Sequence, residues 1–591
     1  MHLFFIKCKT HFLGRLIMVK KLIIIVFVFF GIAASAQISK NEVEVDVNVF
    51  PREDVVLSMN SQVLLAGELL QYKANTLNTS KRPNLLSKVV YVSLRNQNDS
   101  VVFHHKLKVE QGTANGDFFL PSNLRTGIYK LIAYTNFSRN NPQDAFAQKD
   151  IYVINTFEKM DRAPQARDSI KITASSKNDF PKVEENAEGL TININKNTYG
   201  FREKITLQVE ADANISKGNY TLSVRKINPV EIFGRVSKWE EDKASEIFYV
   251  PELRGELISG VVRAKLDSSP APNKEVVLTI PGVDYVAKIA KTNSEGRFFF
   301  SVTEAYNAEK SIVQLYGDEE VRNNYKVVLD SKELKLRPNE PYFLKLDAEL
   351  KQWLQERSVQ LQVENAYFDV KKDSILKNKI NPAFFDDLGT VFTLDDYTRF
   401  PTVRETFVEI VTLAAIRGKD GESRFVVNNA YDPNGIAKFN TADPLVLMDG
   451  MFIQDNTELI NYNARDIQRI RVVNEPYRYG SRIFSGIIAV ETKKGDFVPK
   501  LSPEYVEEIS LQPMIRDKKY YRPDYGQNPS LKRIPDYRVQ LLWEPNIMLT
   551  KGNYETSFYT SDVSGVYEIW IEGFSEEGTY ISTKKYFEVI E

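Results

Sequence analysis

The stretch Gly127-Ile-Tyr-Lys-Leu-Ile-Ala-Tyr134 decides the fold of this chain. A glycine opens it, and tyrosine and apolar residues then alternate, which is the pattern of a β-strand with one face in a core. Two later stretches repeat the pattern, Gly218-Asn-Tyr-Thr-Leu-Ser-Val-Arg225 and Gly565-Val-Tyr-Glu-Ile-Trp-Ile-Glu572. Together they predict three related antiparallel β-sandwich units.

The composition is that of a folded chain with several domains. A length of 591 residues predicts three to five of them. Lys plus Arg number 77 and Asp plus Glu 78, whereas nucleic acids and anionic membranes attract a basic excess. We therefore expect no nucleic-acid partner.

The N-terminus has the pattern of an export signal. Lys20 and Lys21 precede the apolar run 22–30, and Ala34-Ser35-Ala36 follows. This order predicts a signal peptide cleaved between Ala36 and Gln37. The run is shorter than the roughly 20 residues that a membrane span needs, so we expect no transmembrane span. Residues 1–17 add nothing to the pattern, which leaves Met1 and Met18 as alternative start sites.

Few side chains suited to catalysis remain after such a cleavage. The single cysteine, Cys8, leaves with the leader, as do His2 and His11. The remaining histidines, His104 and His105, are neighbours on a predicted strand, so their side chains point to opposite faces. Cysteine nucleophiles, zinc-thiolate sites and Ser-His pairs are thereby excluded. We expect a protein that is not an enzyme and holds no metal or cofactor.

Two sandwich regions carry a family resemblance. Tyr199-Gly-Phe-Arg-Glu-Lys-Ile-Thr-Leu echoes Leu65-Ala-Gly-Glu-Leu-Leu-Gln-Tyr. The region 46–250 resembles the macroglobulin-type domains of alpha-macroglobulins, in the bacterial form common in Bacteroidota envelope proteins. That family traps proteases through a thioester in Cys-Gly-Glu-Gln, which the mature chain cannot form. The C-terminal run with Trp543-Glu-Pro resembles a later domain of the same family.

The middle of the chain resembles a different module. Leu257-Ile-Ser-Gly-Val-Val and Thr292-Asn-Ser-Glu-Gly-Arg-Phe-Phe-Phe are similar to the carboxypeptidase-regulatory-like sandwich. The resemblance implies a spacer without catalytic residues. Further on, Leu350, Trp353 and Leu361 in a polar run predict a connecting helix.

Two ordered motifs lie between residues 385 and 497: Asp443-Pro-Leu-Val-Leu-Met-Asp-Gly450 and Tyr479-Gly-Ser-Arg-Ile-Phe-Ser-Gly-Ile-Ile-Ala-Val-Glu-Thr-Lys-Lys-Gly495. They look like the plug domain of TonB-dependent receptors. The resemblance implies a small α+β domain with these structural motif residues: Asp443, Pro444, Asp449, Gly450, Tyr479, Gly480, Gly486 and Gly495.

The residues of this region also predict its elements directly. The stripe from Val403 to Ala414 predicts an amphipathic helix of about three to four turns, and residues 469–473 predict a strand. Asp395, Asp396, Asp443 and Asp449 lie at helix entries or turns, so we interpret them as caps rather than calcium ligands.

A receptor barrel of about 22 strands needs several hundred residues. About 94 residues follow Phe497, so we expect a plug-like domain without its own barrel.

The predicted fold class is mainly β, with several immunoglobulin-like or macroglobulin-type sandwiches and one small α+β plug-like domain. The predicted parts are the leader 1–36, a macroglobulin-type sandwich 37–158, a linker 159–188, a second macroglobulin-like sandwich 189–253, a carboxypeptidase-regulatory-like sandwich 254–336, a helical connector 337–384, the plug-like domain 385–497, an irregular connector 498–531 and a C-terminal macroglobulin-like sandwich 532–591.

The leading hypothesis is an exported scaffold or accessory protein of the periplasm or the periplasmic face of the outer membrane. Its plug-like domain would dock on or cap an outer-membrane β-barrel partner or envelope complex. One alternative is a steric protease-binding protein like an alpha-macroglobulin, and another is a binding protein displayed on the cell surface. The oligomeric state stays open.

Overall fold

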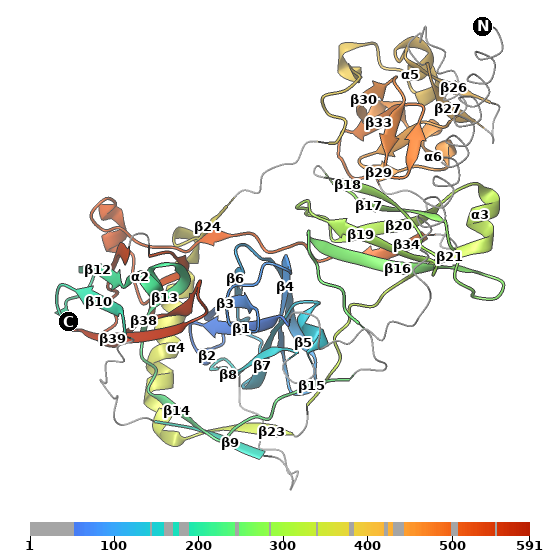
Figure 1. The fold of residues 1–591 in the computed structure, drawn as a ribbon. Helices are drawn as coiled ribbons and strands as arrows, with labels where there is room; N and C mark the ends of the chain where they lie inside the picture. The colour runs from blue at the N-terminus through green and yellow to red at the C-terminus, as the bar shows by residue number, and fades with distance from the viewer. Residues whose placement is uncertain are drawn as a thin grey trace, which may run out of the picture. The chain divides into compact units, whose positions relative to one another are not determined.

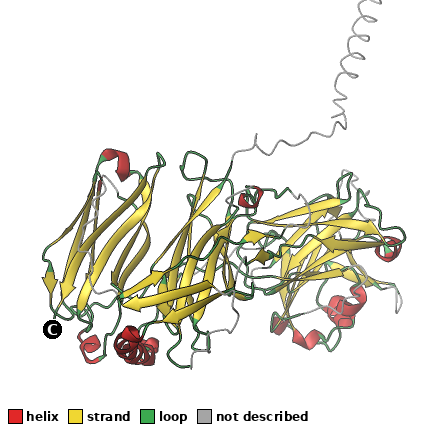
Figure 2. Ribbon diagram, turned by 90° about the horizontal axis from the view of Figure 1, so that it is seen from below, coloured by secondary structure: helices red, strands yellow, loops and turns green. Residues whose placement is uncertain are grey.

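The computed structural model describes residues 52–141, 145–158, 170–176, 188–242, 248–282, 285–338, 341–376, 383–418, 423–428, 442–497, 506–549 and 552–591. The described residues all belong to one unit, Arg52–Glu591. The predicted cleavage site at Ala36 and Gln37 lies outside them. The described chain is mainly β with few helices, which confirms the predicted fold class (Figures 1 and 2).

The first sandwich packs a five-stranded sheet against a three-stranded one. The larger sheet has the order β2-β8-β7-β4-β5 and the smaller β1-β3-β6. Tyr72, Leu94, Leu131 and Ile151 are fully buried between them. The strands are β1 (Asp54–Met59), β2 (Val63–Leu65), β3 (Leu69–Leu77), β4 (Val89–Arg95), β5 (Val101–Lys108), β6 (Thr113–Phe119), β7 (Gly127–Tyr134) and β8 (Ala147–Ile154).

A second sandwich is built from two distant segments, and we call it the composite sandwich. Its sheets have the orders β11-β39-β38-β13-β36 and β10-β12-β37. In Figure 1 its green and red strands lie side by side. The strands are β10 (Leu190–Ile194), β11 (Thr198–Tyr199), β12 (Lys204–Ala211), β13 (Gly218–Lys226), β36 (Gln540–Ile547), β37 (Asn553–Tyr559), β38 (Gly565–Ser575) and β39 (Tyr580–Val589), with the short helix α2 (Ala213–Ser216).

The prediction of separate sandwiches at 189–253 and 532–591 is therefore wrong. Each segment has strands with one apolar face and too few strands to cover it. Leu222 and Val224 of β13 and Ile569 and Ile571 of β38 are fully buried in one shared core. The two segments complete each other.

The repeated tyrosines explain the pattern Gly-x-Tyr. All three are buried, and each hydroxyl donates a hydrogen bond to a backbone carbonyl four or five residues upstream, as in a tyrosine corner. The bonds run from Tyr129 to Arg125 (2.8 Å), from Tyr220 to Ile215 (2.6 Å) and from Tyr567 to Val563 (2.9 Å). Two of these strands, β13 and β38, are paired neighbours, so the three repeats mark two sandwiches and not three.

The third sandwich has the sheets β19-β16-β21 and β18-β17-β20-β34. Its last strand, β34, comes from the predicted irregular connector 498–531, which is thus wrong in part: Ile509 and Leu511 pack on this core. The elements are β16 (Glu256–Ala264), β17 (Glu275–Ile280), β18 (Val286–Lys291), β19 (Arg297–Val302), β20 (Lys310–Tyr316), α3 (Glu319–Asn324), β21 (Tyr325–Leu329) and β34 (Val506–Ser510).

A small sheet, β14-β9-β23, lies beside the helix α4. Its central strand falls in the predicted linker 159–188, which is wrong for 170–176, because Ile172 and Ala174 are fully buried in that otherwise polar stretch. The predicted helix is confirmed, with Leu361 buried. The elements are β9 (Ile170–Ser176), β14 (Val230–Phe233), β23 (Tyr342–Leu346) and α4 (Lys351–Ala366); short pairs join β15 (Glu240–Glu241) to β22 (Leu336–Arg337) and β24 (Ser374–Ile375) to β35 (Lys518–Lys519).

The region 383–497 forms an α+β unit around the sheet β25-β30-β33-β28-β29. The helix predicted from Val403 to Ala414 is shorter than expected: it ends at Glu409, and Ala414 already starts a strand. The elements are β25 (Thr390–Thr393), α5 (Val403–Glu409), β26 (Ala414–Arg417), β27 (Arg424–Val427), β28 (Leu445–Met448), β29 (Met451–Phe452), α6 (Asn456–Ile460), β30 (Ile467–Val473), β31 (Tyr477–Tyr479), β32 (Arg482–Phe484) and β33 (Ile487–Thr492).

Single 3₁₀ turns complete the described structure: η1 (Ser138–Asn140), η2 (Ala348–Leu350), η3 (Phe368–Val370), η4 (Leu394–Asp396), η6 (Ala464–Asp466) and η7 (Pro529–Arg533). Among the helices of the described residues, none has the length and apolarity to cross a membrane.

The tyrosine corner of β13 should stabilise the composite sandwich measurably. Tyr220→Phe leaves the carbonyl of Ile215 without its donor, so we expect a loss of about 1–2 kcal/mol in the free energy of unfolding. Urea denaturation followed by tryptophan fluorescence measures it, because Trp543 and Trp570 belong to this sandwich. The control Tyr397→Phe, at an exposed tyrosine of the α+β unit, should leave the transition unchanged.

Candidate functional site

The sheet of the α+β unit is covered on both faces. Val446 and Met448 of β28 face a core that α5, α6 and the hairpin β26–β27 complete. Leu445 and Leu447 of the same strand face the third sandwich. This two-sided burial explains why β28 is apolar along its whole length.

The predicted turn Asp449-Gly450 is a two-residue hairpin between β28 and β29. Both residues have positive φ, 46° and 80°, as a type I′ turn requires. The buried Asp449 carboxylate accepts hydrogen bonds from the Thr492 amide (2.7 Å), the Thr492 hydroxyl (2.5 Å) and the Phe497 amide (3.0 Å). It ties the hairpin to the end of β33, in keeping with a capping role.

Asp443 and Pro444 precede the same strand. Asp443 is exposed and lies 3.6 Å from Arg424, and Pro444 is buried. Asp395 forms a 2.6 Å ion pair with Arg399. Among the described residues, no group of three or more His, Cys, Asp or Glu side chains could hold a metal ion.

Three of the predicted motif residues meet the third sandwich. The Tyr479 hydroxyl donates to the carbonyl of Ala287. A β-carbon on Gly480 would lie 3.0 Å from Ile289, and one on Gly450 would lie 2.2 Å from Tyr285. These glycines thus permit a close approach between the two cores.

The other two motif glycines have different roles. A β-carbon on Gly486 would lie 2.3 Å from the carbonyl oxygen of Val473, so this glycine lets neighbouring strands approach within the sheet. Gly495 has a φ of 65° and open space around it, so it serves the turn alone. The structure therefore divides the motif residues between the interface, the sheet and the turns.

A polar joint that the sequence analysis missed strengthens this interface. The Gln314 amide donates to the carbonyl of Phe452 (3.0 Å), and the Gln454 amide donates to the Gln314 side chain (2.7 Å). Arg482 forms an ion pair with Glu275. In the sequence, the only indication of this polar contact is a glutamine within the otherwise apolar strand Ile312-Val-Gln-Leu.

Gly450 should matter more than Gly495, although both have positive φ. Gly450→Ala adds a clash with Tyr285 to the backbone cost of about 1 kcal/mol that Gly495→Ala also carries. We expect the first substitution to lower the free energy of unfolding by roughly 2–4 kcal/mol, measured by chemical denaturation.

The clash can be isolated with Tyr285→Gly, because the β-carbon of Tyr285 itself lies 2.2 Å from the one added at Gly450. In that background Gly450→Ala should cost about as much as Gly495→Ala. If Gly450→Ala lowered the free energy of unfolding as much in this background as in the original chain, the strain would not come from the contact with Tyr285.

A cavity of about 1050 Å³ lies where the first sandwich, the composite sandwich, α4 and the segment 518–522 meet. Strands β6 and β36, which are outer strands of their sheets, both contribute to its wall. Near one end Asn546 of β36 donates to Asn115 of β6 (2.8 Å).

A buried ion cluster belongs to this wall. The Glu68 carboxylate lies 2.6 Å from Arg357 and 3.2 Å from Arg225. Burial alone would raise the pKa of Glu68, but the two guanidinium charges outweigh it and hold the pKa below its usual range. The cluster thus joins the first sandwich, α4 and β13 through one carboxylate.

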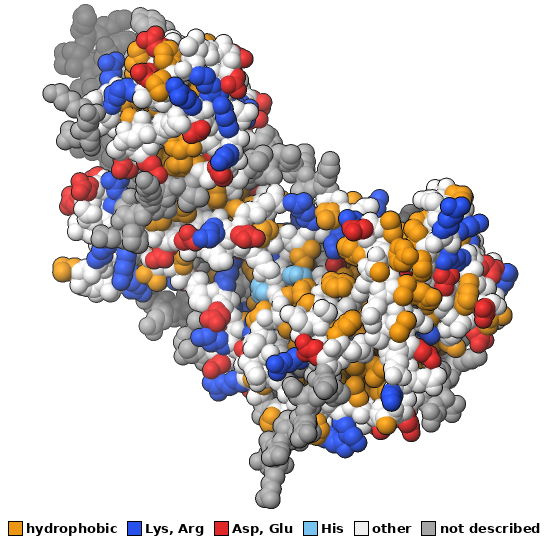
Figure 3. Space-filling model, turned by 180° about the vertical axis from the view of Figure 1, so that it is seen from behind, with side chains coloured by type: hydrophobic (Ala, Val, Ile, Leu, Met, Phe, Trp, Pro, Cys, Tyr) orange, Lys and Arg blue, Asp and Glu red, His pale blue; other side chains and the backbone are white. Residues whose placement is uncertain are grey.

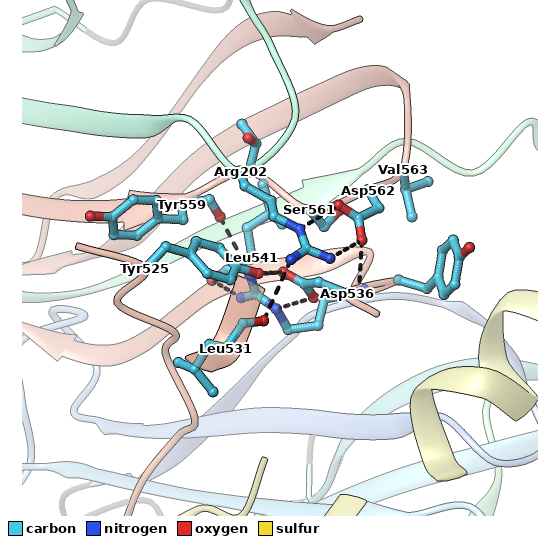
Figure 4. Close-up of polar contacts among 12 residues, drawn as sticks. Arg202, Tyr525, Leu531, Asp536, Leu541, Tyr559, Ser561, Asp562 and Val563 are labelled. Atoms are coloured by element: carbon cyan, nitrogen blue, oxygen red, sulfur yellow. Dashed lines mark hydrogen bonds and ion pairs between the residues drawn. The ribbon is translucent and has the colours of Figure 1, made fainter. Parts of the chain in front are cut away.

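A second ion network fixes the chain that enters β36 (Figure 4). Arg202 pairs with Asp562 (2.6 Å) and donates to the carbonyl of Lys532 (2.6 Å). Asp536 accepts from the hydroxyl of Tyr525 (2.6 Å) and pairs with Arg538 (2.7 Å). The residues before β36 are therefore held at several points.

The two remaining histidines lie on opposite faces of β5, as predicted. His105 Nδ1 is 2.6 Å from the hydroxyl of Tyr72, and His104 stacks on Tyr91. Burial lowers the pKa of each imidazole to about 4. Both are neutral at pH 7 and serve the packing of the first sandwich.

These histidines should make the first sandwich acid-sensitive. Their folded pKa values lie below the unfolded value of about 6.5, so the unfolded chain binds protons first. The contribution of the two histidines to stability should be constant above about pH 6.5 and fall by roughly 1–3 kcal/mol per histidine as the pH drops toward 4. His105→Gln should flatten this decline in urea denaturation between these pH values; an unchanged slope would contradict the assignment.

Three comparisons relate the chain to known proteins. No protein-family model matches it. No curated protein matches it. Among solved structures, it is similar to trypsin-activated alpha-2-macroglobulin from Escherichia coli, with 10% identity and a TM-score of 0.22 over 91% of this chain and 41% of that one.

Two further structures are similar. Salmonella alpha-2-macroglobulin reacted with methylamine has 9% identity and a TM-score of 0.23 over 92% of this chain and 40% of that one. The Yersinia pseudotuberculosis adhesin InvE has 12% identity and a TM-score of 0.12 over 47% of this chain and 57% of that one. The chain thus spans about two fifths of the macroglobulin structures, and its similarity to bacterial alpha-2-macroglobulins is distant.

Proposed function

We propose that the protein is a non-enzymatic scaffold or accessory protein of the periplasm or the periplasmic face of the outer membrane. In this proposal the sandwiches hold the α+β unit, as a plug-like domain, against an outer-membrane β-barrel partner. The third sandwich serves as the spacer that a carboxypeptidase-regulatory-like module would provide, in an envelope protein of Bacteroidota type.

The observation that carries the proposal is the way in which the α+β unit is mounted. The third sandwich adds Ile312 and Val506 to the core under α5, and it covers the other face of the unit's sheet more extensively. The other layer, with α5 and the hairpin β26–β27, points away from that sandwich. Val408 of α5 is 71% exposed there, which leaves this layer as a contact surface.

The way in which the α+β unit is mounted also indicates which of its surfaces would face a barrel partner. The turns with Gly450 and Gly480 are turned toward the third sandwich, so a barrel partner would meet α5 rather than these motif turns. The fixed polar joint at Gln314 and Gln454 would keep that surface oriented.

The chemistry of the described side chains supports a role without catalysis. His104 and His105 are held in aromatic contacts with their pKa values lowered to about 4 by burial. Neither therefore offers an imidazole tuned near neutral pH, where a general base works best.

Site-specific crosslinking in intact cells tests the proposal. A photo-reactive phenylalanine analogue at Val408 should capture an outer-membrane β-barrel protein, identified by mass spectrometry of outer-membrane fractions. The matched control is the same analogue at Leu266 of the third sandwich, which is 99% exposed and should capture no barrel.

Two other outcomes would count against barrel docking. Capture of a protease at Val408 would favour the steric protease-binding alternative. Recovery of the chain as a soluble monomer with no crosslink from either position would remove the basis for a barrel partner. Protease shaving of the same cells distinguishes periplasmic exposure from surface display.

A further inference from the structure

Polar contacts join the first sandwich to the composite sandwich. Asn115 accepts from Asn546 (2.8 Å), Glu68 pairs with Arg225 (3.2 Å), and Lys73 of β3 donates to Asn219 of β13 (2.6 Å). Of the residues in these contacts, only Lys73 is fully buried. The joint therefore contains a lysine whose nitrogen meets a neutral carboxamide.

The burial of Lys73 is unusual for a lysine. On the face drawn in Figure 3, lysine and arginine side chains lie at the surface, and a fully buried lysine is normally paired with a carboxylate. Lys73 forms no ion pair with another described residue. Burial, partly offset by the charge of Glu572, lowers the pKa of Lys73 to about 7. About half of the molecules therefore carry a neutral amine at pH 7.

The Lys73 amine lies close to an electrophilic carbon. Its Nζ is 2.6 Å from Oδ1 of Asn219, and a C=O bond is about 1.23 Å long, so Nζ is at most about 3.8 Å from Cγ. Groups that are poised to react lie about 3–3.5 Å apart. A small rotation of the Asn219 side chain would bring Cγ within that distance.

Glu572 of β38 lies on the same face of the composite sandwich as Asn219. It pairs in the sheet with Thr221, two residues after Asn219, so the two side chains are diagonal neighbours within reach of each other. The Tyr580 hydroxyl donates to Oε2 of Glu572 (2.8 Å). Its other oxygen, Oε1, is buried and has no hydrogen-bond partner among the described residues.

The Glu572 carboxyl is suited to moving protons. Burial raises its pKa, which favours the protonated form relative to an exposed glutamate. Ser58, which faces Lys73 across β1 and β3, is also a neighbour of this carboxyl. An amine, a carboxamide and a proton-transfer group thus meet at one buried place.

We propose that Lys73 and Asn219 become joined by an amide bond, which links the first sandwich covalently to the composite sandwich. The lone pair of Lys73 Nζ forms a bond to Cγ of Asn219, and the Glu572 carboxyl donates a proton to Oδ1. Glu572 then takes a proton from Nζ and passes it to the side-chain nitrogen of Asn219. That nitrogen leaves with its bonding electrons as ammonia, the C=O bond re-forms, and the proton on Oδ1 returns to Glu572.

The product suits this joint better than the free side chains do. An amide is neutral, so no ammonium has to be buried at Lys73. The bond closes a loop between residues 73 and 219, which restricts the unfolded chain as a disulfide would. The single cysteine of the sequence, Cys8, lies in the predicted leader, so the mature chain has no disulfide to serve that purpose.

Peptide mapping of the folded mature chain tests the proposal. Trypsin should release a branched peptide in which residues 53–81 are joined to residues 218–225. Its mass should be one ammonia molecule below the sum of the two peptides, and its fragmentation should show two N-termini. The mass of the intact chain is not used, because cyclisation of an N-terminal Gln37 also releases ammonia. Recovery of the two peptides only in separate, linear form would overturn the proposal.

Cleavage at methionine gives a second measurement that does not depend on folding. Met160 lies between Lys73 and Asn219 in the sequence. After cyanogen bromide treatment of the denatured chain, the fragments 60–160 and 161–448 should migrate as one species on a denaturing gel. Separate migration of the two fragments would contradict the covalent link.

Substitutions assign the roles of the three side chains. Lys73→Arg and Asn219→Ala should abolish the branched peptide, and Glu572→Gln should lower its yield at least about tenfold, because it removes the proton-transfer group. The matched control is Glu568→Gln on the same face of β38, where Glu568 pairs with Lys584 (3.3 Å); it should leave the yield unchanged. An equal loss in both glutamine variants would overturn the role of Glu572.

The folding of each variant is checked by its urea transition. The branched peptide of the unaltered chain decides whether the bond exists, even if a variant does not fold. Lys73, Asn219 and Glu572 lie outside the α+β unit, so the result is independent of any docking at Val408.

Discussion

The pairing of β13 with β38 is the constraint on which the rest of the described chain depends. Nine residue pairs join 218–226 to 567–575, so the C-terminal segment completes a sandwich that begins at Leu190. Closing a loop of this length costs about 5 kcal/mol in chain entropy. Fully buried side chains such as Val224 and Ile569 each contribute roughly 1.5–3 kcal/mol and together offset it. The third sandwich and the α+β unit are thereby held between two strands of one sheet.

Local features of the fold could be predicted because short-range chemistry determines them. Alternation identified β7, β13 and β38, and the pair Asp449-Gly450 identified a hairpin whose turn needs two residues with positive φ. The opposite orientation of His104 and His105 followed from the two-residue period of a strand. In each case the deciding residues are neighbours in sequence.

Partner choice could not be predicted in the same way. Strands β13 and β38 have the same apolar period, and nothing within either says that the other is its neighbour. Strand β9 was hidden because only Ile172 and Ala174 are buried in a polar stretch. The predicted length of α5 was too great, because the apolar stripe to Ala414 continues through a turn into β26, whose inward residues keep a similar spacing.

For the candidate site, the sequence motif indicated turns. The residues that contact the hairpin at Gly450, Tyr285 and Gln314, lie well over a hundred residues earlier in the chain. The cavity wall comes from several distant segments, which no single motif encodes.

The composite sandwich also determines when its strands can pair during synthesis of the chain. Strand β13 is complete when Lys226 has been made, yet its partner β36 begins at Gln540, about 300 residues later. At the usual 5–20 residues per second, the half-sandwich stays open for roughly a quarter of a minute to a minute. During that interval Leu222 and Val224 have no core to enter. A chain interrupted before β38 would keep this apolar strand exposed permanently, so early termination creates an aggregation-prone species rather than a shorter functional protein.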